Sequence, residues 1–370
     1  MNENQRSEVS GQRSVNQKLT HLQNENLVAF RARWVVLPLT FLCFGLAPMA
    51  RAVGPDAEGA IAGSNNGEGV GVLVNRTTGN WNTGTGFEAL NHLTGGNQNT
   101  ATGFWALLSD TTGSYNTATG VLALFSNTTG FFNNATGAYS LANNTDGSQN
   151  TAVGYGALYR NTADGNTATG FGALFSNTTG TDNIANGTFA LLSNTEGESN
   201  TAIGNSALLS NTIGIQNTAN GDSALFSNTT GSLNTAIGEG ALNSNSTGDY
   251  NTAIGDRALF GNTIGNGNVA LGLLAGAQQT TGSNNVYIGY NLQGTAGESN
   301  ACYIASIFGQ TSVDGMPVLI NANHKLGTAT SSKRFKEDIK PIDKASEALF
   351  ALKPVAFRYK RRLIRPVHHS

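Results

Sequence analysis

The chain has 370 residues and a formal net charge of −2; 47 residues are glycine and only 12% are charged. Ordinary globular domains have about 25% charged residues, so this is not the composition of an average soluble domain. Residues 53–324 hold three basic and sixteen acidic side chains, whereas residues 325–370 hold twelve basic and four acidic ones. The acidic central region excludes nucleic acid as its partner, because that binding needs a basic surface.

Residues 1–52 are predicted to be an export signal with a long, basic amino-terminal region. The apolar run Trp34–Leu46 follows Arg31 and Arg33, and Ala50–Ala52 provides a small-x-small cleavage site. The run is too short to span a membrane comfortably, and a proline interrupts it. We expect a secreted or cell-surface protein with no membrane span in the mature chain. An uncleaved amino-terminal anchor is the alternative.

A 17-residue repeat organises residues 82–289, after a Gly-rich lead-in (53–81) that is either flexible or a first, irregular coil. The unit is roughly Asn-Thr-Ala-(Ile/Thr/Val)-Gly-x-x-Ala-Leu-x-Ser-Asn-Thr-Thr-Gly-x-x, with one 16-residue copy at 150–165. A fixed period of this kind indicates a repeat architecture. The asparagines that open the copies are Asn82, Asn99, Asn116, Asn133, Asn150, Asn166, Asn183, Asn200, Asn217, Asn234, Asn251, Asn268 and Asn285.

Each copy is predicted to contain two short strands and two turns. Its two glycines and its short apolar pairs do not fit the 3.6-residue period of a helix. The segments 201–204 and 207–210 are typical of strands. The segments 205–206 and 211–214 are typical of turns, in which Gly supplies a positive φ and Asn tolerates the left-handed conformation. The predicted fold class is therefore all-β, a parallel β-solenoid (β-roll) of about thirteen 17-residue coils that stack about 4.8 Å apart.

One leucine and two alanines per copy are predicted to line the interior of the solenoid. Stacked coils would bury a continuous but thin apolar seam, which offsets little of the ordering entropy of a lone chain. We therefore expect chains to associate, as a trimer whose coils share an axis. The leucines are Leu90, Leu107, Leu124, Leu141, Leu158, Leu174, Leu191, Leu208, Leu225, Leu242 and Leu259.

The opening asparagines are predicted to form an internal ladder in which side-chain amides hydrogen-bond from coil to coil. The alternatives are glycosylation, at sequons such as Asn127 and Asn177, and metal binding. The sequons follow from the spelling of the repeat, and the calcium-binding nonapeptide pattern is absent. We favour the ladder, and we expect neither a metal nor a cofactor. Its representative positions are Asn99, Asn116, Asn150, Asn200, Asn234 and Asn251, packed beside Leu107, Leu124, Leu208 and Leu225.

The Asn-Thr-Ala-Ile-Gly-x-x-Ala-Leu unit of residues 82–289 resembles the head repeats of trimeric autotransporter adhesins. Ala-Ile-Gly is the most specific part of this resemblance, and the unit is longer here. The resemblance implies a left-handed parallel β-roll in which three chains pack together. It also implies an adhesive surface whose ligand is another cell surface, a polysaccharide or a protein.

Residues 290–329 are predicted to be a β neck, because the 17-residue spacing stops at residue 289. The segments 302–307 and 318–321 are typical of conventional strands between Gly-rich turns. Cys43 lies in the predicted signal, so Cys302 has no intrachain partner in the mature protein. Cys302 is expected to be a buried thiol, and a cross-link between chains of the trimer is the alternative.

Residues 330–370 are predicted to be a short α+β fragment, with a helix at 345–352 and a strand from Pro354. Ser331–Lys336, Ile339–Pro341 and Pro354–Tyr359 resemble the start of the self-cleaving intramolecular chaperone domain of phage tail spikes and endosialidases. The resemblance implies that Ser331 is a nucleophile and Lys336 its general base, with cleavage beside Ser331. A desolvated lysine can accept the serine proton. Few residues follow the strand that ends at Tyr359, so we expect a truncated copy of the domain.

These observations favour an exported structural or adhesive fibre, similar to a tail fibre or an adhesin. A fibre matured by Ser/Lys autoproteolysis is one alternative, and the enzymatic role would then be confined to the chain itself. The other alternative is a solenoid that binds ice or a crystal surface. Thr-x-Thr pairs at 100–102, 117–119 and 167–169 form a regular hydroxyl array, which breaks where the second threonine becomes Ile203, Ile237 or Ile254.

Overall fold

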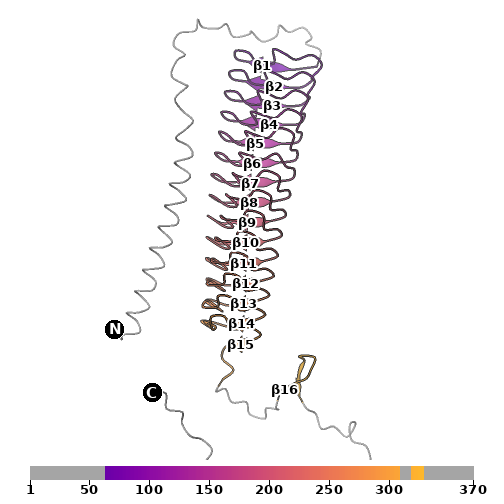
Figure 1. The fold of residues 1–370 in the computed structure, drawn as a ribbon. Helices are drawn as coiled ribbons and strands as arrows, with labels where there is room; N and C mark the ends of the chain where they lie inside the picture. Colours follow the sequence, from indigo (N-terminus) through magenta and orange to yellow (C-terminus); the bar gives the residue numbers. More distant parts are fainter. Residues whose placement is uncertain (1–62, 309–317, 329–370) are drawn as a thin grey trace, which may run out of the picture. The chain divides into compact units, whose positions relative to one another are not determined.

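The computed structural model describes residues 63–308 and 318–328, which belong to two units that divide after Ile307. In the first unit the backbone winds into successive coils, each with one short strand, stacked in chain order (Figure 1). No helix occurs among the described residues.

Fifteen three-residue strands form one parallel sheet, and each strand pairs with the equivalent residues of its neighbours. Ala219, for example, lies opposite Ala202 and Ala236. The register survives the 16-residue copy, where Ala152 faces Ala168. The strands are β1 (Asn66–Glu68), β2 (Thr83–Thr85), β3 (Thr100–Thr102), β4 (Thr117–Thr119), β5 (Asn134–Thr136), β6 (Thr151–Val153), β7 (Thr167–Thr169), β8 (Ile184–Asn186), β9 (Thr201–Ile203), β10 (Thr218–Asn220), β11 (Thr235–Ile237), β12 (Thr252–Ile254), β13 (Val269–Leu271), β14 (Val286–Ile288) and β15 (Cys302–Ile304).

This sheet confirms the predicted all-β parallel solenoid. The strand ladder begins at Asn66 and ends at Ile304, one coil beyond the 17-residue repeat at each end. A step of about 4.8 Å per strand gives the ladder a length of about 65 Å. Cys302 lies in the last strand and is exposed, so the expectation of a buried thiol is wrong.

The second strand predicted for each coil is absent from the described coils, and a series of turns takes its place. Leu208 and Leu225 each have a φ of 52°, so leucine holds a left-handed position in addition to glycines with a positive φ, such as Gly204 at 130°. A left-handed residue ends an extended run, which is why residues 207–210 cannot form a strand. This conformation costs about 1–2 kcal/mol per residue, and full burial of a leucine contributes about 1.5–3 kcal/mol in return.

The interior of each coil has an apolar side built from leucine and alanine. Leu107, Leu124, Leu208 and Leu225 are 0% exposed. The alanine at the centre of each regular strand also points inward, while its two neighbours in the strand are partly or fully exposed, as in the exposed–buried–exposed pattern of β3. In β14 this central position holds Tyr287, which is 0% exposed and lies against Gly276, the residue at the leucine position of the preceding coil.

The second unit contains a single described hairpin. Strand β16 (Val318–Ile320) pairs antiparallel with β17 (Leu326–Thr328). The side chains of Val318, Leu319, Ile320 and Leu326 are exposed. The predicted export signal and the predicted helix at 345–352 lie outside the described residues.

The burial of the leucine row predicts a large difference between two substitutions with the same backbone conformation. Leu208 is fully buried at φ 52°, whereas Leu233 is 41% exposed at φ 59°. Leu208→Ala should lower the free energy of unfolding by about 2–5 kcal/mol, because it leaves a cavity, and Leu233→Ala by less than about 1 kcal/mol. Chemical denaturation of the full chain measures both. Equal losses would show that left-handed strain, and not burial, determines the effect.

Buried polar ladders and candidate functional surfaces

A ladder of buried asparagines runs through the first position of the coils. From Asn99 to Asn285, each backbone N–H donates to the side-chain oxygen of the asparagine one coil earlier, at 2.9–3.0 Å. Each side-chain amide also reaches across its own coil: Asn116 Nδ2 donates to the carbonyl of Gly130 at 2.8 Å. These side chains are at most 1% exposed. The predicted ladder positions Asn99, Asn116, Asn150, Asn200, Asn234 and Asn251 all lie in this row.

A second ladder occupies the twelfth position, and the sequence analysis misses it. Asn194 Nδ2 donates to Asn177 Oδ1 at 2.8 Å, and Asn211 Nδ2 donates to Asn194 Oδ1 at 2.7 Å. Asn127 and Asn177, the proposed sequons, are 0% exposed members of this ladder, so the folded coil gives a glycosyl group no access to them. The repetition of asparagine at this position, one coil apart, is the signal that could have revealed the ladder.

From the coil of Asn116 to that of Asn251, both ladders converge on one carbonyl per coil, which belongs to glycine except for Ala163 in the 16-residue coil. The Gly214 carbonyl accepts from Asn200 Nδ2 at 2.8 Å and from Asn211 Nδ2 at 3.0 Å. A Cβ atom on Gly214 would collide with the carbonyl oxygen of Gly231 and with the Asn211 side chain. Glycine is therefore required here by contact between coils, and not by a positive φ.

Threonines at the thirteenth position form a third row of contacts. Thr94 Oγ1 donates to the carbonyl of Thr111 at 2.9 Å, and Thr111 Oγ1 to that of Thr128 at 2.9 Å. Every coil is thus joined to the next by side chains as well as by the sheet.

Asp110 begins the second ladder, in place of asparagine. Its Oδ1 accepts from the Gly113 N–H at 3.0 Å and from Asn127 Nδ2 at 3.2 Å. Its Oδ2 is buried and has no hydrogen-bond partner among the described residues. Burial raises the pKa of this carboxyl to about 7, against the lowering effect of the hydrogen bonds from Gly113 and Asn127.

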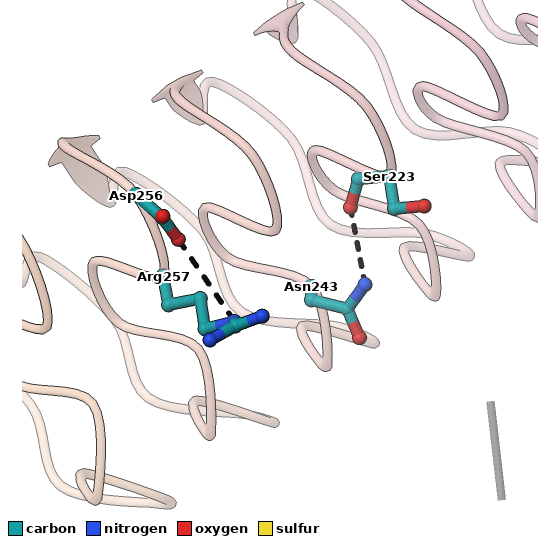
Figure 2. A network of polar contacts seen from close by, with 4 residues as sticks. All are labelled: Ser223, Asn243, Asp256 and Arg257. Carbon is teal, nitrogen blue, oxygen red and sulfur yellow. Dashed lines mark hydrogen bonds and ion pairs between the residues drawn. The ribbon is translucent and has the colours of Figure 1, made fainter. Parts of the chain in front are cut away.

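Two polar contacts lie in the turns that follow strands β10, β11 and β12 (Figure 2). Arg257 Nε lies 3.9 Å from Asp256 Oδ1, and the two side chains are 43% and 46% exposed. Asn243 Nδ2 donates to the backbone carbonyl of Ser223 at 3.1 Å, one coil away. An exposed pair of this kind contributes little stability, so we assign Asp256 and Arg257 to a solvated face, whereas Asn243 is buried at 5% exposure.

Two features are absent from residues 63–308 and 318–328, a cluster of metal-ligating side chains and a membrane-spanning helix. This part of the chain contains no group of three or more His, Cys, Asp or Glu side chains that could hold a metal ion. Among the same residues, no helix is long and apolar enough to cross a membrane. Ser331 and Lys336, the predicted catalytic pair, lie outside the described residues.

The raised pKa of Asp110 predicts a pH-dependent stability. The folded state holds this proton more tightly than the unfolded state, whose carboxyl has a pKa near 3.8. The stabilisation is therefore complete below about pH 4 and is lost as the pH rises towards 7. Asp110→Asn should remove this decline and be more stable than the parent chain at pH 8, by an amount on the order of a few kcal/mol. Denaturation of both chains at pH 4 and pH 8 measures it, and parallel pH profiles would contradict the assignment.

Comparison with known proteins identifies one part of the chain. The family model for the chaperone of endosialidase matches residues 331–367, so its first matched residue is Ser331. This match supports a chaperone domain of that kind at the carboxyl-terminal part of the chain, as the resemblance implies. No curated protein and no solved structure matches the chain. The resemblance of residues 82–289 to trimeric adhesin heads therefore stays a prediction.

Proposed function

We propose that this chain is a structural and adhesive fibre protein, similar to a phage tail fibre, that is exported or displayed on a surface. The observation that carries the proposal is the arrangement along the chain. A regular solenoid ends at Ile304, and a segment matching the chaperone of endosialidase follows at 331–367. A rod that depends on the stacking of identical coils would benefit from a chaperone that sets its assembly.

The proposed fibre is a homotrimer, and two apolar surfaces support association. Ile237, Ile254, Leu271 and Ile288 point outward from β11 to β14 at equivalent positions, and they are 38–48% exposed. A continuous row of exposed aliphatic side chains is more often an interaction surface than a surface that stays in contact with solvent. The hairpin β16–β17 also exposes its aliphatic side chains, and an isolated two-stranded hairpin is only marginally stable in water.

Autoproteolysis is the second candidate function, and the position of the family match favours it. The match starts at Ser331, which the sequence resemblance assigns as the nucleophile, with Lys336 as the base. In this proposal the Ser331 hydroxyl loses its proton to Lys336 and attacks the carbonyl carbon of Thr330. The Thr330–Ser331 peptide bond breaks as Lys336 returns the proton to the Ser331 nitrogen, and an ester forms between the Thr330 carbonyl and Ser331 Oγ. Water then hydrolyses the ester, which restores the Ser331 hydroxyl and releases the carboxyl-terminal piece.

Two measurements on the purified full chain test these proposals. Light scattering should give a native mass of three chains, and a monomeric native mass would contradict the fibre proposal. Denaturing mass spectrometry should show a chain that ends at Thr330 in the parent protein and an uncut chain in Ser331→Ala. An uncut parent chain, or the same fragments in both proteins, would reject autoproteolysis and leave the fibre proposal standing.

A further inference from the structure

Two rows of hydroxyl side chains line the outer face of the sheet from β2 to β7. Threonine occupies both outward positions of β2, β3, β4 and β7, and one outward position of β5 and β6. In β3, β4 and β7 both of these threonines are exposed. From β9 the second row changes to Ile203, and later to Ile237 and Ile254. The first row continues through Thr252 of β12, so the two threonine rows occur together only in the amino-terminal half of the solenoid.

Most of these hydroxyls are not used by the fold; Thr136 Oγ1 is an exception and donates to Asn134 Oδ1 at 3.5 Å. Within the described residues, the side chains of Thr100, Thr102, Thr117 and Thr119 make no hydrogen bond. The threonines of the thirteenth position, such as Thr111, instead bond the next coil. The solenoid therefore does not explain why polar side chains recur on this face, and their donors and acceptors remain available to a ligand.

Aromatic side chains lie beside the hydroxyl rows, two residues beyond the ends of β2, β3, β6 and β7. The same position holds Val121 after β4 and Ala138 after β5, so the aromatic side chains form two separate pairs, which we call the aromatic ridge. Phe87 stacks on Phe104 with ring centroids 5.2 Å apart, and Tyr155 stacks on Phe171 at 5.3 Å. Phe87, Tyr155 and Phe171 are 37–41% exposed. The equivalent position holds Thr188 after β8, Asn205 after β9 and acidic residues after β10 to β12, so the ridge ends near where the second threonine row ends.

No charge lies on this combined surface, which we call the hydroxyl–aromatic surface. It consists of the two outward positions of β2 to β7 and the sixth position of the same coils, and none of these positions holds an acidic or basic residue. The carboxylates of the corresponding position, Asp222, Glu239 and Asp256, begin only in the coils of β10 to β12. A neutral partner is thus favoured over a charged one.

We propose that the hydroxyl–aromatic surface binds a neutral polysaccharide chain. A sugar ring has an apolar C–H face and a rim of hydroxyl groups, and these complement the aromatic ridge and the threonine rows respectively. A polymer of identical units also matches a surface that repeats about every 4.8 Å. This inference rests on the proposed adhesive function and names the class of its ligand.

Ice is the competing occupant of a regular threonine array. The aromatic ridge has no role in matching a water lattice, and the threonine rows are interrupted by Asn134 and Val153. Both features favour an amphipathic sugar polymer, which tolerates an irregular site.

The test is affinity electrophoresis of the full chain in native gels that contain dextran, galactomannan or hydroxyethyl cellulose, with hyaluronate as the anionic control. The double variant Thr117→Val/Thr119→Val removes two hydroxyls of the surface and keeps the side-chain shape. Thr218→Val/Thr235→Val makes the same change in β10 and β11, outside the surface, and is the matched control.

We expect at least one neutral polysaccharide to retard the parent chain and the control. Loss of two hydroxyl contacts should weaken the affinity of the Thr117/Thr119 variant about tenfold. No retardation by any neutral polymer, or equal loss in the control, would overturn the inference. If the parent chain shows thermal hysteresis, the Thr117/Thr119 variant loses it, and no polymer retards the parent chain, the surface would be assigned to ice instead. The native mass of the same sample separates these outcomes from a failure of the fibre proposal itself.

Discussion

The hydrogen bond between buried asparagines of successive coils is the interaction on which the rest of this solenoid depends. A buried amide must satisfy its donors and its acceptor inside the protein, because an unpaired group costs about 1–3 kcal/mol. Asn200 meets this requirement: its backbone N–H and Nδ2 bond to Asn183, and its Oδ1 accepts from Asn217. Each coil can satisfy its asparagines only if its neighbours are in register. The polar interior therefore sets the 17-residue step more strictly than the thin leucine seam could.

The irregular coil shows what a change of step does. In the 16-residue copy, Asn161 Nδ2 donates to the Ala163 carbonyl, and Asn144 Oδ1 is left buried without a partner among the described residues. The second ladder is broken at this point, whereas the first continues from Asn166 to Asn150 at 2.9 Å. The ends of the second ladder are similarly incomplete, because Asp110 Oδ2 and Gln279 Oε1 also have no partner in the described chain. The sheet and the first ladder hold the register across these defects.

The repeat period and the apolar inward positions could be predicted from the sequence, because one residue type predominates at each of them. The conformation between the strands could not. Local preference favours an extended conformation at Leu208 and a left-handed turn near Asn211. In the structure Leu208 is left-handed and Asn211 is not, because the hydrogen bonds between coils determine the backbone conformation. The second ladder escapes prediction for the same reason, since Asn-Thr-Thr-Gly is also a good turn sequence. Ser331 and Lys336 rest on the family match and on resemblance, so the coils say nothing about their chemistry.

The most direct measurement of the ladder account is hydrogen exchange, followed by mass spectrometry, in the full chain carrying Asn200→Ala or Asn205→Ala. Both asparagines lie in the same coil, but Asn200 is 0% exposed in the first ladder and Asn205 is an exposed residue of the outer surface. The account predicts that Asn200→Ala speeds amide exchange in residues 200–217 at least tenfold, since losing one buried amide costs about 1.4 kcal/mol or more. Asn205→Ala should leave exchange there unchanged. Equal exchange in the two variants would mean that the sheet and the leucine seam alone hold the coils together.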